Sequence, residues 1–412
     1  MRRILVLNAG SGSQKCSLFE LPDAGLPVEP LEPIWESSFD STAPGQPEGK
    51  IVLRVRRGDE EIEAGSVAKE SSIEERDERL LELLWDFRTK TVTGPSEIDF
   101  VGHRVVHGGA EFGAAVRVTD DVEATIDRCS AFAPLHNPEN LTGIRVARKV
   151  FGKKTPQAAV FDTAFHRTLS EAAATYAGPY DWLEQGIRRY GFHGTNFRWA
   201  AERAAHLLNW KQDDELRLIL CHLGGGCSLC ATRDGRSIDT TMGFTPLDGL
   251  AMCTRSGSVD PGILFYLARQ GATIDELDRV LNKESGLKGL SGFPGDTRII
   301  IPAANNGNPR AGLAMNVFIH RLRAGIGEML AALGQPPHAI VFTDVIGESE
   351  PGIRAAACEA FSFLGLQLDQ SRNAASPRDT DIAAPESAVR VLLIKSREAW
   401  QIARECFELL IG

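Results

Sequence analysis

The sequence predicts an α/β protein that contains two duplicated domains. Predicted strands alternate with predicted helices along most of the 412 residues, which is typical of the α/β class. Two Gly-rich segments share one layout, in which an apolar strand leads into a tight turn and then a second strand. A chain of this length has room for two domains of ordinary size.

The first Gly-rich segment reads LNAGSGSQKCSL and begins at Leu7. The phosphate-loop pattern GxxxxGK[ST] is not met, because Gln14 stands at its second glycine and Cys16 follows Lys15. Residues 15–21 are short and apolar and predict a strand, so the segment is a β-hairpin. This arrangement rules out a P-loop and a dinucleotide-binding fold. An ordinary surface turn and a phosphate-binding turn both fit these residues taken alone.

The second segment, residues 216–232, reads LRLILCHLGGGCSLCAT. Setting residues 5–7 against residues 218–220 places Gly10 near Gly224, which indicates a duplication. Duplicated domains of this kind can face each other across a cleft, where each hairpin offers backbone N–H groups to a chain of phosphates.

The remaining elements follow from hydrophobic spacing and from residues that start and stop helices. Asn137-Pro138 is a good helix start and Gly152 a good stop. In chain order the sequence predicts a hairpin around residues 57–59, a helix over 72–88 with Phe87 on its apolar face, a helix over 137–152, a buried strand over 157–161 that ends at Asp162, and a last helix over 397–410.

Composition excludes several classes of protein. A net charge of −10 disfavours nonspecific binding of nucleic acid, which requires a basic surface. No apolar run approaches the length of a membrane span, so no membrane partner is expected. The apolar run after Met1-Arg2-Arg3 is too short for the core of a signal peptide, and the cytoplasm is the expected location.

The eight cysteines do not form a disulfide framework in a chain of this size. Cys227 and Cys230, with Cys221 and His222 upstream, have a spacing that resembles a metal site. No second CxxC or HxxxH completes a tetrahedral set, and residues three apart in a strand point to opposite faces. Buried apolar thiols are the favoured interpretation.

Polar residues gather in four short segments where predicted elements end. The segments are GHRVVHGG at 102–109, LHNP at 135–138, DTAFH at 162–166 and YGFHGT at 190–195. Ligands of open α/β sheets bind beyond the carboxyl ends of strands, so this clustering favours a binding site. A buried, hydrogen-bonded ring remains the alternative for any single histidine.

These motifs, in this order, resemble the acetate kinase family of the actin/sugar-kinase/heat-shock ATPase superfamily. The resemblance also includes NAGSGSQK, APLHNP, CHLGGG, DTTMGFTPLDGLAMCTRSG and the DTR element at 296–298, and it runs nearly the full length. It implies two actin-like (ribonuclease H-like) domains that face a central cleft. Their expected bounds are 1–163, joined by a C-terminal helix at 391–412, and 164–390. A homodimer is implied as well.

The resemblance implies reversible transfer of a phosphoryl group between a phosphate donor and acetate, directly and in line, giving acetyl phosphate. Arg104 and Arg255 correspond to the pair that holds the carboxylate and the phosphoryl group, because guanidinium forks donate two parallel hydrogen bonds to such anions. His193 corresponds to the histidine on the phosphoryl oxygens, His136 to a supporting one, and Asp162 to the essential aspartate.

The resemblance also implies a metal, an acyl pocket and a donor site. Mg²⁺, with Mn²⁺ as an alternative, is expected on Asn8 and Glu398 with bridging waters. The acetate pocket is expected to contain Arg104, Val106, Leu135, Phe192 and Pro246. The donor site is expected to contain Ser11, Ser13, Lys15, His222, Gly224, Gly225, Gly226, Asp296, Thr297, Arg298, Asp344, Val345, Ile346 and Gly347.

Departures from the family pattern concentrate on the donor side. Gly12 replaces a serine, Gly225 an asparagine, Asp344 and Val345 two adjacent glycines, and Ser349 an asparagine. Glycine allows close approach of a ligand to the backbone, whereas valine adds bulk and aspartate adds negative charge. Two interpretations remain open: a shifted loop that still admits ATP, or a blocked adenosine pocket with pyrophosphate as donor.

Two other classes are weighed against the kinase. One is a homologue that has lost turnover and serves as a binding or scaffold protein. The retention of all the expected catalytic and metal residues argues against it. The other is an ATPase or sugar kinase of the same superfamily, which the specific acyl-side motifs disfavour.

Overall fold

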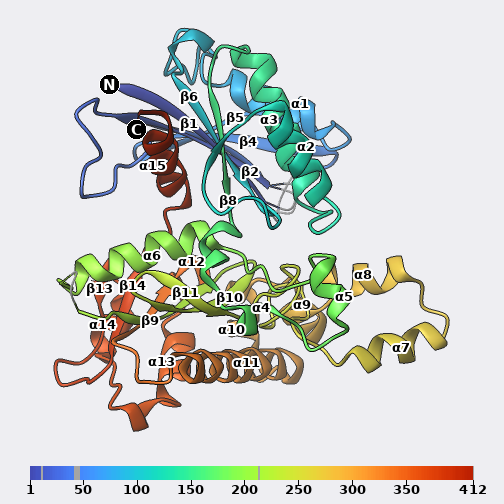
Figure 1. Cartoon of the computed structure of the whole chain (residues 1–412), viewed down its shortest axis with the longest axis vertical. Helices are drawn as coiled ribbons and strands as arrows, with labels where there is room; N and C mark the ends of the chain where they lie inside the picture. Colours follow the sequence, from blue (N-terminus) through green and yellow to red (C-terminus); the bar gives the residue numbers. More distant parts are fainter. Residues whose placement is uncertain (11–12, 41–46, 212–213, 412) are drawn as a thin grey trace. The chain divides into compact units, whose positions relative to one another are not determined.

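The computed structural model describes residues 1–412 except 11–12, 41–46, 212–213 and 412. The chain forms two compact units (Figure 1). Unit 1 comprises Met1–Ala164 and Arg397–Gly412, and unit 2 comprises Phe165–Ser396. No helix in the described part of the chain is long and apolar enough to cross a membrane.

Unit 1 contains one eight-stranded sheet in the order β5-β4-β3-β2-β1-β6-β8-β7. Strands β1 to β5 form an antiparallel meander, while β6 and β8 continue the sheet parallel to β1. The elements are β1 (Arg2–Gly10), β2 (Ser13–Leu21), β3 (Trp35–Asp40), β4 (Lys50–Arg57), β5 (Glu60–Ala68), α1 (Ile73–Glu82), η1 (Pro95–Glu97), β6 (Phe100–Val105), β7 (Val116–Arg117), α2 (Asp120–Cys129), α3 (Asn137–Phe151), β8 (Gln157–Phe161) and α15 (Glu398–Ile411).

Unit 2 contains a six-stranded sheet in the order β11-β10-β9-β12-β14-β13, with α6 and α11 on its two faces (Figure 1). Strands β9, β10 and β11 are antiparallel, while β12 and β14 run parallel to β9. The elements are η2 (Ala164–Thr168), α4 (Glu171–Ala174), α5 (Tyr180–Glu184), α6 (Gly194–Leu207), β9 (Arg217–Leu223), β10 (Cys227–Arg233), β11 (Arg236–Thr240), α7 (Pro261–Arg269), α8 (Ile274–Lys283), α9 (Gly286–Ser291), α10 (Thr297–Asn305), α11 (Pro309–Leu333), β12 (Ala339–Thr343), α12 (Asp344–Ser349), α13 (Pro351–Glu359), η3 (Ser362–Leu364), α14 (Gln370–Ala375), β13 (Thr380–Asp381) and β14 (Arg390–Ile394).

The two sheets share one connectivity. In each, the first strand is central, its hairpin partner lies on one side, and two later strands extend the sheet in parallel on the other. Both Gly-rich segments are the turns of these first hairpins, β1–β2 and β9–β10. The prediction of a duplicated α/β fold is confirmed.

The two sheets exchange covering helices: a helix that comes after the last parallel strand of one sheet in the sequence packs on the other sheet. Helix α15 comes after β14 but packs against β1, β6 and β8, whereas α6 comes after β8 and packs against β9, β12 and β14. Gly102 on β6 allows α15 to approach closely, since a Cβ there would lie 2.5 Å from Sγ of Cys406. This packing fixes the position of Glu398, the first residue of α15.

The hairpin at 57–59, the helix at 137–152, the strand at 157–161 and the last helix occur as predicted. The helix expected over 72–88 ends earlier, at Glu82. After it the chain forms a turn in which the Thr89 hydroxyl donates to the Leu83 carbonyl at 2.6 Å. Phe87 lies in this turn, where it is 86% exposed and does not pack on the core. The C-terminal helix begins at Glu398, since residues 391–394 of the expected helical segment belong to β14 in the second sheet.

Candidate active site

In unit 1 a polar network forms at the carboxyl ends of three parallel strands. Asn8 lies near the end of β1, Arg104 on β6, and Asp162 directly after β8, where its backbone N–H donates to the Val105 carbonyl at 3.0 Å. Parallel pairing of these strands brings their ends to one edge of the sheet. Glu398 joins the group from the N-terminus of α15.

Arg104 is the centre of this network. Its Nη2 donates to Oδ2 of Asp162 at 2.6 Å, and its Nε is shared between Oδ1 and Oδ2 at 3.2 and 3.0 Å, so the guanidinium engages both carboxylate oxygens. Its Nη1 donates to Oδ1 of Asn8 at 3.2 Å. Asn8 Nδ2 in turn donates to Oε2 of Glu398 at 3.0 Å. The Asp162 side chain is buried, so the guanidinium compensates a charge that has little access to water.

The segment around His136 is held by the next helix. His136 is the residue before α3, and Asn137 and Asn140 of that helix accept from the backbone N–H groups of His107 and Val106 at 3.0 and 3.1 Å. Val106 is buried, whereas Leu135 and His136 are half-buried. The structure therefore places the unit 1 members of the expected acyl pocket at the ends of β6 and the start of α3.

The turn of the first hairpin is flanked by a charged group on β2 and β3. Lys15 Nζ lies 2.5 Å from Oε1 of Glu36, a buried carboxylate that also pairs with Arg56. The Lys15 side chain is 46% exposed, so its desolvation by the surrounding protein is partial; this desolvation lowers the pKa of Lys15, and the Arg56 cation adds to the lowering. Ser13 opens β2, while Ser11 and Gly12 lie outside the described residues. Donor binding by Lys15 stays a prediction.

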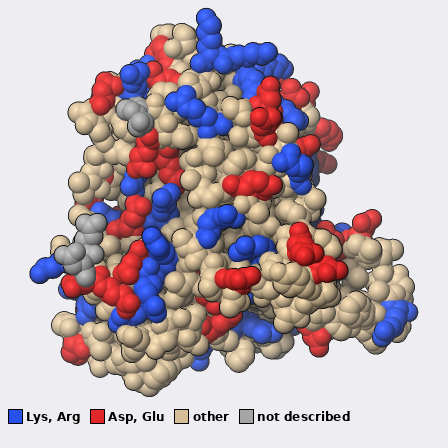
Figure 2. All heavy atoms as spheres, in the orientation of Figure 1, with Lys and Arg blue, Asp and Glu red and all other residues tan. Residues whose placement is uncertain are grey.

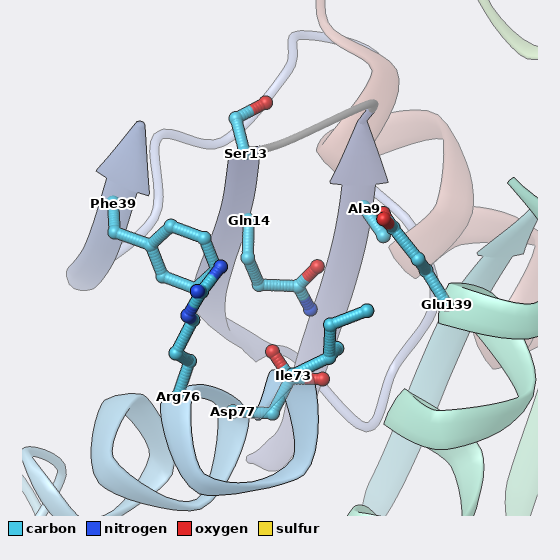
Figure 3. Close-up of a pocket in the computed structure, with 8 residues that line it drawn as sticks. All are labelled: Ala9, Ser13, Gln14, Phe39, Ile73, Arg76, Asp77 and Glu139. Carbon is cyan, nitrogen blue, oxygen red and sulfur yellow. The ribbon is translucent and has the colours of Figure 1, made fainter. Parts of the chain in front are cut away.

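A small cavity lies beside this hairpin, between β1, β2 and α1 (Figure 3). Its volume is about 20 Å³, roughly the space for one water molecule. Asp77 faces it with only 3% of its surface exposed, and its Oδ1 has no hydrogen-bond partner among the described residues. Burial, and then the neighbouring Glu139, raise the pKa of Asp77 to about 7. The cavity is lined by Ala9, Ser13, Gln14, Phe39, Ile73, Arg76, Asp77 and Glu139.

In unit 2 the second hairpin turn lies beside two stacked histidines. The rings of His193 and His222 are 3.9 Å apart and nearly parallel. His193 has a left-handed backbone with φ 58° at the N-terminus of α6, and its Nδ1 lies 2.8 Å from the Ser228 hydroxyl on β10. Nδ1 of His222, on β9, lies 2.7 Å from Nδ2 of Asn196 on α6. Hydrogen bonds thus fix both rings at the hairpin.

The three turn glycines have different surroundings. A Cβ on Gly226 would lie 3.1 Å from Nε2 of His193 and 3.4 Å from Nη1 of Arg255, so imidazole and guanidinium groups face this end of the turn. A Cβ on Gly224 would lie 1.8 Å from Oδ2 of Asp344, so a carboxylate covers the other end. Gly225 has open space beside it.

The other predicted donor residues are on helix ends in unit 2. Asp296 precedes α10 and pairs with the exposed Arg298 at 2.7 Å, while the Thr297 hydroxyl donates to Glu350 at 3.0 Å. Ile346 and Gly347 are buried in α12. Val345, at the start of the same helix, is 67% exposed.

Of the remaining acyl-pocket residues, Phe192 is buried and Pro246 half-buried in unit 2. The Pro246 carbonyl accepts from Nη1 of Arg255 at 3.3 Å. This contact and the neighbouring Gly226 place Arg255 at the second hairpin.

The cysteines of the CxxC segment are buried thiols, as the sequence indicates. Burial raises the pKa of Cys230 well above its ordinary value and does the same for Cys227. Cys227 Sγ lies 3.4 Å from the Gly224 carbonyl, and Cys230 Sγ lies 3.3 Å from the Ser237 hydroxyl. Neither environment favours a thiolate, the form that binds metal.

Three supporting residues were missed by sequence reasoning. Ser228 and Asn196 orient the two histidines, and the fully buried Arg354 donates to the carbonyls of Gly347 and Glu348 at 2.8 and 3.0 Å. Asn196 lies three residues after His193, a spacing that places both at the start of α6 and could have signalled it. Arg354 gives no sequence signal, since arginine is usually exposed.

Two sheets of one connectivity, each opened by a Gly-rich hairpin with histidine, arginine or carboxylate groups beside it, define a phosphotransferase with the actin/sugar-kinase fold. A model of the Acetokinase family matches residues 3–404, and the chain belongs to that family.

Individual comparisons agree with this assignment. The chain is 52% identical over 408 residues to the acetate kinase of Gloeobacter violaceus, a match that covers 98% of this chain and 99% of that protein. The crystal structure of Porphyromonas gingivalis acetate kinase matches with a TM-score of 0.86 and 36% identity, and covers 100% of both chains. A propionate kinase from Francisella tularensis matches with a TM-score of 0.88 and 35% identity, again over 100% of both chains.

Proposed function

We propose that this protein is an acetate kinase, which transfers a phosphoryl group reversibly between a phosphate donor and acetate and forms acetyl phosphate. The observation that carries the proposal is the Arg104–Asp162–Asn8–Glu398 network, because hydrogen bonds within the protein hold a cation and three oxygen-bearing side chains together. Preorganised charge of this kind stabilises developing negative charge without rearrangement at the moment of reaction.

Arg104 binds the carboxylate of acetate in this proposal, and Asp162 holds the guanidinium in the orientation that it needs. Arg255 and His193 bind the oxygens of the phosphoryl group, beside the Gly226 backbone. His136 supports the site from the N-terminus of α3. In-line phosphoryl transfer needs little covalent chemistry from the protein, so positioning and positive charge are sufficient roles for these residues.

The oxygen atoms of Asn8 and Glu398 fit Mg²⁺, with Mn²⁺ as an alternative ion. Both side chains are oxygen donors, they are hydrogen-bonded to one another, and a sparse protein set suits an ion that keeps several waters. When bound, the ion would supply positive charge to the phosphate oxygens. The Asn8–Glu398 hydrogen bond would hold the carboxylate in place for it.

The acyl substrate is acetate, with propionate tolerated. Val106, Leu135, Phe192 and Pro246 are small or apolar side chains, which suits a methyl group. One added methylene typically changes discrimination by only about 1–3 kcal/mol, so the two acids compete. Comparing kcat/KM for the two acids tests this assignment.

The donor is ATP or pyrophosphate. Trapping acetyl phosphate as the hydroxamate with hydroxylamine, with ATP and pyrophosphate supplied in parallel, tests both the reaction and the donor. Product with either donor supports the proposal. No hydroxamate with either, from a folded protein, would leave the scaffold homologue as the better interpretation, although the ordered Arg104 network favours turnover.

We also propose a homodimer, formed through an apolar arm of unit 2 that comprises α7 and α8. Figure 1 shows the arm extending away from the sheet of unit 2, and uncharged surface covers much of it in Figure 2. Phe265 and Ile274 are 64% and 85% exposed, and neither helix has a buried residue. Large apolar side chains exposed in this way favour contact with another protein, here a second copy.

Sedimentation of the wild type and of Phe265→Asp tests the dimer. We expect the wild type to sediment as a dimer and the variant as a monomer. A monomeric wild type at micromolar concentration would contradict the proposal. The cytoplasmic location expected from the sequence stays a prediction.

A further inference from the structure

We propose that Asp344 is the specificity-determining residue of the donor side, a built-in anion at the Gly224 end of the second hairpin that disfavours donors in proportion to the length of their phosphate chain. This inference rests on the proposed function, and it assigns the donor preference to a charge.

The Asp344 carboxylate lies directly against the turn. Its Oδ2 would be 1.8 Å from a Cβ at Gly224, so the carboxylate occupies the place that any side chain there would take. Asp344 lies at the junction of β12 and α12, and its backbone is left-handed there, with φ 67°. Asp and Asn tolerate this conformation better than most residues, so the position itself admits a charged and a neutral form of one shape.

His222 helps to hold the carboxylate at the turn. Its Nε2 lies 3.2 Å from Oδ2 of Asp344. Nδ1 of the same ring lies 2.7 Å from Nδ2 of Asn196, so a ring proton on Nε2, facing the carboxylate, is matched by an amide N–H that donates to Nδ1. The imidazole thus donates to the carboxylate with the N–H that would otherwise be available to a phosphate oxygen.

The opposite end of the turn has the opposite character. Gly226 lies beside His193 and Arg255, and Gly225 between the two ends is open. One phosphoryl group near Gly226 meets a guanidinium and an imidazole. Further phosphates that extend toward Gly224 approach the carboxylate of Asp344. Two negative charges within a few ångströms of each other repel more strongly in a protein site than in water, because the effective dielectric constant is lower.

A graded preference follows from this polarity of the turn. Orthophosphate is affected least, pyrophosphate more, and tripolyphosphate or ATP most. The bulk of Val345 contributes little at this end of the turn, because its side chain is 67% exposed whereas the carboxylate of its neighbour contacts the glycine.

The test measures dissociation constants of orthophosphate, pyrophosphate, tripolyphosphate and ATP by calorimetry, at one fixed Mg²⁺ concentration. Asp344→Asn removes the charge and keeps the shape, and Asp344→Gly covers the case in which the amide variant fails to fold. Val345→Gly removes bulk alone. Asp234→Asn is the matched control, since Asp234 is also left-handed, with φ 51°, and lies at the far end of β10.

We expect Asp344→Asn to tighten pyrophosphate about tenfold and tripolyphosphate and ATP more, while orthophosphate changes less than about threefold. The control should change none of them. An equal gain for all four anions, no gain, or a larger gain from Val345→Gly would overturn the inference. Hydroxamate formation is scored separately, so a protein that binds these anions as predicted but forms no acetyl phosphate would refute the proposed function and leave this inference standing.

Discussion

Replacing Asp77 by asparagine should stabilise the protein at neutral and alkaline pH. Asp77 is 97% removed from solvent in the cavity beside the first hairpin, as its 3% exposure shows, and its Oδ1 has no partner among the described residues (Figure 3). Burial is the main cause of its raised pKa, and Glu139 contributes while Arg76 opposes the rise. The ionised form is therefore the costly one.

The direction and size of the effect on the free energy of unfolding follow from the linkage between protonation of Asp77 and folding. Below pH 3.8 the carboxyl is protonated in both the folded and the unfolded chain, and its full stabilising contribution is present. Between 3.8 and about 7 only the folded protein keeps the proton, so the free energy of unfolding falls as the pH rises, and above about 7 the loss is complete. About three pKa units correspond to an upper bound of about 4 kcal/mol.

The assay is urea unfolding of the wild type and Asp77→Asn between about pH 5 and pH 8. We expect the free energy of unfolding of the variant to rise relative to that of the wild type by about 1.4 kcal/mol per pH unit up to about pH 7. Above that pH the difference should stay constant. Glu74→Gln on the exposed face of the same helix is the control and should show no such slope. A difference between Asp77→Asn and wild type that does not vary with pH would refute the reasoning.

Three further predictions concern single side chains. Arg255→Ala should lower the transfer rate by about 10² to 10³ with an unchanged melting temperature, because a charge clamp is lost, and near-normal turnover would remove Arg255 from the mechanism. Glu398→Gln should weaken binding of Mn²⁺, measured by electron paramagnetic resonance, since a carboxylate ligand is replaced by an amide; equal affinity would exclude Glu398 as a ligand. Arg354→Met should lower the free energy of unfolding by about 3 kcal/mol or more, because the carbonyls of Gly347 and Glu348 lose a buried charged donor, whereas the exposed Arg372→Met should leave it nearly unchanged.

Much of the fold could be predicted because its signals are local. The two Gly-rich hairpins, the helix from Asn137 and the strand before Asp162 each follow from short stretches of apolar spacing and turn residues. The end of α1 could not be predicted, since its apolar pattern continues to Phe87 while the Thr89 hydroxyl and the turn at Leu83 stop the helix. The strand at 390–394 is defined by its pairing with β12, which lies far away in the sequence.

Motif order names Arg104, Asp162 and His193 as candidate site residues, and their roles stay predictions. The sequence does not predict the partners that orient these side chains, because the partners come from other elements. Asn196 on α6 contacts His222 on β9, and the residue spacing within either segment does not predict that contact. The position of Asp344 over Gly224 likewise depends on the pairing of β12 with β9, which the sequence of the loop alone does not contain.

The discontinuity of unit 1 has a consequence for how the protein is made. Its sheet is synthesised first, but the helix that covers β1, β6 and β8 is synthesised only after the whole of unit 2. Until α15 has been made, the apolar face around Gly102 is not covered by this helix. Asn8 also lacks the Glu398 carboxylate to which it donates a hydrogen bond in the folded protein. Chains released before residue 398 should therefore lack both the Glu398 carboxylate, which we propose as a metal ligand, and the packed face, so we expect a truncated chain to be inactive and sensitive to proteolysis.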